Sequence, residues 1–373
     1  MSTNKLHYSE VKFSEDHNVE FYKALRSRVM DHFKTTGTSR HGNTSMVVKT
    51  LIMFAMYFVP FALIVTVIDS NLLGFLAWVL MGFGMAGIGL SVMHDANHGA
   101  YSKNDFVNKW VGHIILAIGG SGMNWRIQHN VLHHTFTNVD GLDEDIDPGV
   151  VMRFSPHKPR LSGHKFQHLY AWFLYGLMTV LWFTTKDFKQ LERYKKMDLL
   201  KTQGFTYKKA FVGLIISKIL YVGLTLGLPL VFSSLPWYLT IAGFFSMHFI
   251  CGFWLGIIFQ PAHVVPSSNY PMPNDSGNIE ADWAVSQLFN TANFAPGAKF
   301  FSWYVGGLNY QVEHHLFPNI CHVHYKNISK IVRATAKEYN LPYNSFKTFG
   351  QALREHGRML YNLGHYDEAP GLH

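Results

Sequence analysis

Residues 51–93 have the sequence LIMFAMYFVPFALIVTVIDSNLLGFLAWVLMGFGMAGIGLSVM. The stretch contains no lysine or arginine, and a three-residue polar turn at 69–71 divides it into two apolar runs. A helix needs about 20 apolar residues to cross a bilayer. The stretch therefore predicts two membrane-spanning helices, at about 51–68 and 72–93, joined by a tight turn.

A second pair of apolar runs lies at about 211–232 and 236–259, separated by a short segment that begins with two serines. No lysine or arginine occurs from 219 to 263, so both turns lack positive charge. The basic residues lie before the first span, between the pairs and after the last span, and the positive-inside rule places those segments in the cytoplasm. We therefore predict an all-α integral membrane protein with four transmembrane helices in two hairpins and a helical cytoplasmic cap.

The composition of the 373 residues agrees with a membrane protein. Charged residues make up 15% of the chain, whereas soluble domains contain about 25%. The two cysteines exclude a disulfide scaffold and a cysteine-based zinc module. The net charge of +8 accompanies no basic run interleaved with aromatic residues, so we expect no nucleic-acid partner.

Outside the spans, the sequence predicts further helices. Residues 1–50 form a cytoplasmic N-terminal segment, and 51–373 form the membrane domain. Within 18–34, one helical face carries the apolar residues Val19, Tyr22, Leu25, Val29 and Phe33, with basic residues elsewhere. This face either lies on an anionic inner leaflet or packs against the cytoplasmic cap. Two more helices are expected at 324–339 and 345–362, the second capped by Ser345.

Three histidine clusters lie just outside the predicted spans, among 22 histidines in the chain. They are His94-Asp-Ala-Asn-His98, His129-Asn-Val-Leu-His133-His134 and Gln311-Val-Glu-His314-His315, and His263 lies where the fourth span ends. Residues i and i+4 share a helical face, so His94 with His98, or His129 with His133, can bind one metal. His134 faces about 100° away from His133, which lets this doublet serve two metals.

Imidazole suits iron, zinc, copper and nickel, whereas calcium and magnesium prefer oxygen ligands. Eight such histidines exceed the needs of one ion, so two ions are expected at the predicted cytoplasmic face. An acidic run follows the second cluster: Asp140, Asp143, Glu144, Asp145 and Asp147. These carboxylates either orient imidazoles or form a solvated loop. Isolated histidines such as His113 and His168 are interpreted as interfacial or structural.

The motifs HxxxH, HxxxHH and QxxHH, in this order around two membrane hairpins, resemble those of the membrane fatty acid desaturase family. The resemblance runs from about residue 51 to the C-terminal helices. It implies two iron ions, dioxygen as co-substrate and an active site on the cytoplasmic face, with no catalytic residue beyond the metal ligands. The implied ligands are His94, His98, His129, His133, His134, His263, His314 and His315.

Two departures refine this resemblance. Gln311 stands where many desaturases have a histidine, as in front-end desaturases, which insert a double bond between an existing one and the carboxyl end. It is therefore a candidate for contact with iron, directly or through water. Many front-end enzymes also carry a fused cytochrome b5 domain with a His-Pro-Gly-Gly motif, which this sequence lacks. We expect a separate electron donor of the ferredoxin or cytochrome b5 type.

The predicted substrate is a fatty acyl lipid or acyl-CoA. Removing hydrogen from an unactivated alkyl chain requires a metal–dioxygen oxidant, which no side chain replaces. The same centre also fits a sphingoid-base desaturase or a lipid hydroxylase, because fold and ligands do not fix the reaction. A zinc protease would leave two clusters unexplained, and a metal transporter would place its ligands at mid-bilayer.

Overall fold

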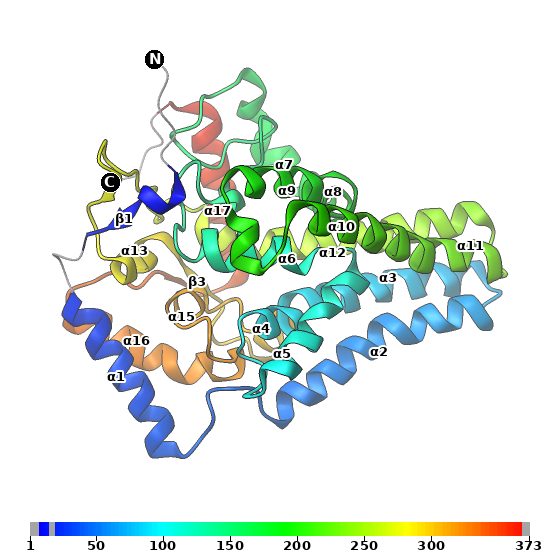
Figure 1. Ribbon diagram of the computed structural model, residues 1–373, viewed down its shortest axis with the longest axis horizontal. Coiled ribbons are helices and arrows are strands. Elements are labelled where there is room, and N and C mark those ends of the chain that lie inside the picture. The colour runs from blue at the N-terminus through cyan, green and yellow to red at the C-terminus, as the bar shows by residue number, and fades with distance from the viewer. Residues whose placement is uncertain (1–6, 15–18, 368–373) are drawn as a thin grey trace. The chain divides into compact units, whose positions relative to one another are not determined.

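The computed structural model describes residues 7–14 and 19–367, and Figure 1 shows its elements. Within these ranges the regular elements are helices and four strands of two residues each, joined by turns and loops. The chain forms two compact units. Unit 1 contains residues up to His41, residues 128–171 and those from Ile258 onward, and unit 2 contains residues 42–127 and 172–257.

Unit 2 holds the apolar helices. Its elements are α2 (Thr44–Thr66), α3 (Asn71–Gly87), α4 (Met93–Asn97), α5 (Asp105–Gly112), α6 (Gly122–Trp125), α8 (Met178–Leu181), α9 (Asp187–Lys196), α10 (Tyr207–Val222) and α11 (Leu228–Phe232). Two helices belong partly to each unit: α7 (Gln167–Gly176) and α12 (Trp237–His263). π-Helical turns join α3 to α4 and α10 to α11.

Four helical segments are long and apolar enough to cross a membrane, as predicted: Thr44–Thr66, Asn71–Asn97, Tyr207–Phe232 and Trp237–His263. The first begins seven residues earlier than predicted because Asn43 caps it and Lys49 is buried within it. The second continues through His94, and the fourth ends at His263. Large apolar side chains remain exposed along these helices, as expected where lipid replaces water.

Glycines allow close packing between the helices of unit 2. A Cβ atom on Gly84 of α3 would lie 2.8 Å from the backbone nitrogen of Tyr57 in α2. A Cβ atom on Gly243 of α12 would lie 2.2 Å from the indole of Trp78 in α3, a fully buried side chain. Small residues at such crossings let membrane helices gain van der Waals contact.

Unit 1 surrounds its core with short elements and three longer helices. They are β1 (Lys12–Phe13), α1 (Val19–Thr36), β2 (Asn278–Ile279), α13 (Trp283–Asn290), β3 (Asn293–Phe294), α14 (Lys299–Tyr304), α15 (Gln311–Leu316), α16 (Tyr325–Glu338), β4 (Ser345–Phe346) and α17 (Phe349–His365). The strands pair in parallel as β1 with β2 and β3 with β4. The domain boundary predicted at residue 50 stays a prediction.

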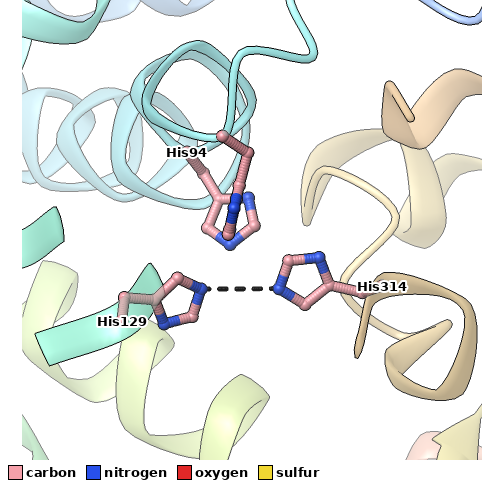
Figure 2. Close-up of side chains that lie close together, drawn as sticks. His94, His129 and His314 are labelled. Atoms are coloured by element: carbon pink, nitrogen blue, oxygen red, sulfur yellow. Dashed lines mark hydrogen bonds between the residues drawn. The ribbon is translucent and has the colours of Figure 1, made fainter. Parts of the chain in front are cut away.

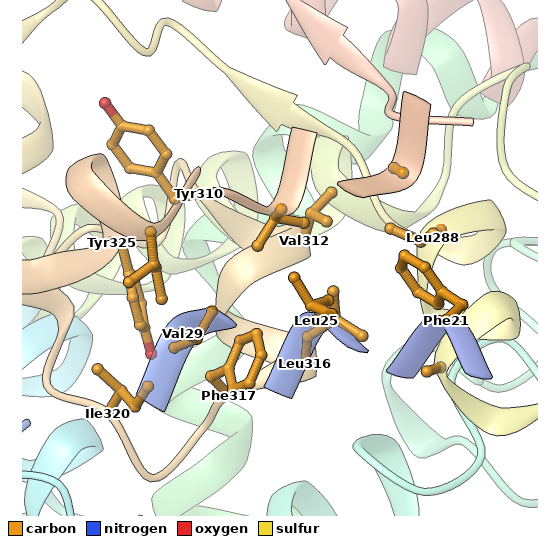
Figure 3. Packing of buried hydrophobic residues seen from close by; sticks show 14 of the residues in the cluster. Phe21, Leu25, Val29, Leu288, Tyr310, Val312, Leu316, Phe317, Ile320 and Tyr325 are labelled. Atoms are coloured by element: carbon orange, nitrogen blue, oxygen red, sulfur yellow. The ribbon is translucent and has the colours of Figure 1, made fainter. Parts of the chain in front are cut away.

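The apolar face of α1 is buried inside unit 1. Phe21, Leu25 and Val29 are fully buried and pack with residues of α13, α15 and α16, as Figure 3 shows. Of the two interpretations of this amphipathic helix, packing within the protein is therefore confirmed. Residue 18 and the side chain of Val19, which belonged to the prediction, lie outside the described residues.

The last helix begins later than predicted. Ser345 is not its cap but part of β4, which pairs with β3. The helix α17 begins at Phe349, and the hydroxyl of Thr348 accepts the backbone N–H of Gln351. Sequence alone did not distinguish two hydroxyl residues three positions apart, because either suits a helix N-cap.

Buried Arg153 ties the end of the chain to unit 1. Its guanidinium donates to five backbone carbonyls, those of Pro156, Lys158, Leu363, Tyr366 and Asp367, at 2.6–2.8 Å. We expect Arg153→Ala to lower the free energy of unfolding by about 3 kcal/mol, since it orphans several buried carbonyls. A thermal unfolding midpoint measured in detergent checks this.

The matched control for Arg153 is Arg160→Ala. Arg160 is exposed and pairs with the exposed Asp367 at 2.9 Å. Because water replaces such surface partners, the control should shift the midpoint far less. Equal shifts for the two variants would refute the role given to Arg153.

Candidate metal centre

The second histidine cluster lies on a π-helix, Arg126–His133, rather than on the α-helix that its spacing suggested. The backbone N–H of His134 donates to the carbonyl of His129, five residues earlier, at 3.0 Å. This wider turn brings the Nε2 atoms of His129 and His134 within 3.3 Å of each other. π-Helical turns occur often at functional sites, and here the turn decides which histidines meet.

Three ring nitrogens converge in a first group. The Nε2 atom of His134 lies 3.0 Å from that of His314. The Nε2 atoms of His314 and His129 are 3.4 Å apart, the contact drawn as a dashed line in Figure 2. Nitrogens bound to one ion at about 2.1 Å are separated by about 3.0–3.4 Å. The spacing of this group therefore fits one bound metal.

A second group contains His133, His263 and His315. Their ring centroids are each 4.8 Å from the other two, and ligand nitrogens of all three lie within 4.8 Å of one another. All three side chains are buried, yet within the described part of the chain their Nε2 atoms have no hydrogen-bond partner. Buried polar atoms are nearly always bonded. A metal ion at this group would satisfy all three.

Asp143 fixes the orientation of His133. Both carboxylate oxygens lie 3.0 Å from the His133 Nδ1 atom, and they also accept the backbone N–H groups of Asn138 and Asp145. Burial disfavours the charged imidazole, but Asp143 and Asp145 outweigh it and raise the pKa of His133 to about 9. With its Nδ1 atom held in this way, His133 presents its Nε2 atom to the second group.

Helix α13 fixes two more histidines. The side-chain oxygen of Gln287 is 2.9 Å from the His315 Nδ1 atom, and the carbonyl of Asn290 is 3.2 Å from the His263 Nδ1 atom. Burial and the neighbouring His134 lower the pKa of His315 well below its ordinary value, which keeps its imidazole neutral. The neutral form is the one that binds metal.

The third cluster lies on α15, a helix of six residues. The hydroxyl oxygen of Tyr325 lies 3.2 Å from the His314 Nδ1 atom. The Glu313 carboxylate accepts hydrogen bonds from Asn293 and Tyr343, and burial raises its pKa to about 7. Glu313 therefore anchors α15 rather than supplying a ligand.

Gln311, at the start of α15, is buried beside His263. Its amide interacts with the His263 side chain, although the contact is outside strict hydrogen-bond geometry. A buried amide so close to His263 is suited to contact a metal at this group or a water bound to it.

The acidic residues that follow the second cluster make two different kinds of contact. Asp143 holds His133, and Asp145 accepts from the side chain of Gln128. Asp140 and Asp147 instead lie 3.7 and 3.5 Å from the Lys158 ammonium. Of the two interpretations given for this run, orientation of an imidazole holds for Asp143.

The first cluster belongs to unit 2. His94 and His98 lie on and just after α4, with ring centroids 4.7 Å apart, so they share a face as the i, i+4 spacing predicts. Both rings meet Trp125 edge-on at 5.6 Å. His94 is buried, and His98 is half-buried. The other six predicted ligands come together in unit 1.

Sequence reasoning missed the partners that orient these imidazoles, notably Gln287, Asn290 and Tyr325. The only signal for the first two was a pair of amides three residues apart in the mostly apolar segment 283–290. That spacing places them on one face of α13, but it does not name the histidines they meet.

The fold and the site define a helical protein with four helices long and apolar enough to span a membrane and with buried histidine groups that could hold metal ions. The fatty acid desaturase family model matches residues 70–347. The chain therefore belongs to the fatty acid desaturase family, and its interpretation as a fatty acid desaturase enzyme is confirmed.

Named relatives cover nearly the whole chain. It is 34% identical over 359 residues to the sn-1 linoleoyl-lipid 6-desaturase of Synechocystis sp., covering 95% of this chain and 98% of the relative. It is 34% identical to the acyl-lipid (8-3)-desaturase of Physcomitrium patens, covering 97% and 75%. It is 31% identical to the Delta(5) fatty acid desaturase A of Dictyostelium discoideum, covering 96% and 77%.

Proposed function

We propose that this chain is a front-end acyl-lipid desaturase, which inserts a double bond between an existing one and the carboxyl end of a lipid-bound acyl chain. The observation that carries the proposal is the convergence of six buried histidines in unit 1, with Gln311 on the same helix as His314 and His315. The names of the relatives from Synechocystis and Physcomitrium favour an acyl lipid over acyl-CoA.

The proposed cofactor is a pair of iron ions held by the histidines of all three clusters together with His263. Iron with dioxygen supplies an oxidant strong enough for an unactivated C–H bond. The protein orients the imidazoles of His133, His315 and His263 through Asp143, Gln287 and Asn290, respectively. Overall, two hydrogens leave the acyl chain, and with two electrons and two protons they reduce one dioxygen to two waters.

The membrane topology is part of the same proposal. Two hairpins enter the bilayer from the cytoplasm, and the histidine clusters lie on the cytoplasmic side. The absence of lysine and arginine from both turns supports this orientation, because positive residues are retained on the cytoplasmic side.

Fatty-acid methyl-ester profiling tests the reaction. Host membranes that contain the protein and are supplied with linoleate should yield a new trienoic ester, with the added double bond on the carboxyl side. Membranes without the protein are the control. A hydroxylated product, or no new product despite protein in the membrane fraction, would contradict the proposal.

Replacing Gln311 tests its place beside the metal. Gln311→His should keep iron and part of the turnover, because the family's other branch has a histidine ligand here. Gln311→Ala should lose at least about tenfold more, since it leaves the position without a donor. The measurement is product per membrane-inserted protein, and an alanine variant as active as the histidine variant would exclude contact with the site.

A further inference from the structure

The three histidines of the second group come from distant parts of the sequence, and one dipeptide of unit 1 contacts all three. His133 ends the π-helix, His263 ends α12 and His315 lies on α15. The dipeptide Thr137–Asn138 lies in the turn after the π-helix, and both of its side chains are buried. Its contacts add to those that the histidine rings make with Asp143 and α13.

Thr137 links two of these histidines through its hydroxyl. The hydroxyl oxygen lies 2.7 Å from the His133 carbonyl oxygen, 2.8 Å from the Gln287 side-chain oxygen and 3.2 Å from the His315 Nδ1 atom. A histidine that binds metal through Nε2 carries its hydrogen on Nδ1, so His315 donates to Thr137 or to Gln287. The Thr137 hydroxyl donates to the His133 carbonyl or to Gln287. The position of the His315 ring therefore depends on Thr137 as well as on Gln287.

Asn138 links His263 to the carboxylate that orients His133. Its backbone N–H donates to Asp143 at 2.9 Å, and Asp143 holds the His133 Nδ1 atom. Its side-chain amide donates to the backbone carbonyls of His263 and Asn269, both at 3.0 Å. Both amide hydrogens are thus used. The φ of Asn138 is 61°, in the left-handed region that asparagine adopts more readily than most residues.

The dipeptide gives each histidine of the second group a second point of attachment. The partners described above orient the three rings through their Nδ1 atoms. Asn138 also holds the backbone of His263. Thr137 contacts the backbone of His133 and the ring of His315. Fixing a group at two points keeps the three Nε2 atoms together before an ion binds, and such preorganisation raises affinity.

We propose that Thr137 and Asn138 are positioning residues, which set the geometry of the second histidine group and thereby the metal affinity of that site. The inference rests on the proposed function, because that function assigns an iron ion to this group. Among the residues described, no hydrogen bond joins either side chain to His129, His134 or His314 of the first group. Loss of these side chains should therefore weaken one site and spare the other.

Metal titration tests the role of Thr137 independently of turnover. Metal-free, full-length protein in detergent is titrated anaerobically with iron(II), and calorimetry follows the binding of the two ions. Thr137→Val keeps the shape of the side chain but removes the hydroxyl, so it should weaken one ion by about 10- to 100-fold. Thr137→Ser keeps the hydroxyl and should bind both ions normally. Equal affinities in the valine and serine variants would overturn the role of Thr137.

Replacing Asn138 by glycine tests the other side chain. Glycine adopts a φ of 61° without strain and keeps the backbone N–H that bonds to Asp143. The change therefore removes only the side-chain bonds to the carbonyls of His263 and Asn269. Asn138→Gly should weaken one ion by about tenfold or more, as Thr137→Val does. Unchanged affinity for both ions would overturn the role of Asn138.

The matched control is Gln167→Ala. The buried amide of Gln167, also in unit 1, donates to the backbone carbonyls of Arg153 and Leu360 at 3.1 and 2.8 Å. It thus makes bonds of the same kind away from the histidines. The control should lower the thermal unfolding midpoint and leave both iron affinities unchanged. A loss of affinity as large as that of Asn138→Gly would make Asn138 merely structural.

Histidine replacements identify the affected ion. In His263→Ala, which disables the second group, adding Asn138→Gly should not change the affinity of the remaining ion. In His129→Ala, which disables the first group, the same addition should still weaken the remaining ion. Effects of equal size in the two backgrounds would overturn the assignment to the second group. The absence of a desaturated product would refute the proposed function, whereas only these affinities can refute the positioning role.

Discussion

Replacing His315 by alanine is expected to abolish product formation while the protein remains expressed and inserted in the membrane. His315 lies with His133 and His263 in the second group, and its ligand nitrogen also comes within 4.8 Å of those of His134 and His314, two members of the first group. Its loss would therefore remove a donor from the second proposed metal site and alter the surroundings of the first. His98→Ala and His133→Ala should have the same outcome. The measurement is methyl-ester product per unit of membrane-inserted protein.

The matched controls are histidines outside the groups. His113 is exposed and bonds to the Lys109 carbonyl, and His168 packs against Tyr361. His113→Ala and His168→Ala should retain activity. Near-normal turnover in His315→Ala, or activity lost equally in the controls, would show that the site has been assigned to the wrong residues.

Asp143→Asn should lower iron affinity and activity by about 10- to 100-fold, the usual cost of removing a residue that orients a metal-binding histidine. Asp143 bonds the His133 Nδ1 atom with both oxygens and is completely enclosed with it. The asparagine lacks the negative charge of Asp143. Its amide nitrogen is a donor, so it would face another donor, either the His133 N–H or a backbone N–H, and that hydrogen bond would be lost. Iron content after titration with a chelator measures the affinity.

Asp140→Asn is the control for Asp143, because Asp140 belongs to the same acidic run but pairs with Lys158. It should keep both iron and turnover. If the two variants behave alike, the run acts through its overall charge rather than through one oriented imidazole.

The histidine spacing and the apolar runs predicted most of the site and the four candidate spans. Each depends on local periodicity, which is read directly from the sequence. The π-helical turn at His129–His134 was not predictable in this way, because its wider hydrogen bonding leaves no distinct pattern of residue types. It places His134 beside His129 and His314, a contact that α-helical spacing does not give.

The burial of helix α1 and the partners of the histidines depend on tertiary packing, which the sequence pattern does not reveal. The apolar face of α1 suited a membrane surface and a protein core equally well, and only the position of Phe21, Leu25 and Val29 among residues of α13, α15 and α16 resolved this. The partners Gln287 and Asn290 likewise approach their histidines through the fold rather than through sequence proximity.

The central claim is that this desaturase works through a pair of irons bound by its histidines, and iron stoichiometry tests it most directly. Protein matured in iron-replete cells and purified without chelators should contain two iron ions per chain by elemental analysis. Zinc should appear only when iron is limiting, because imidazole sites accept both metals. One ion per chain, or none, in protein that forms product would contradict the claim.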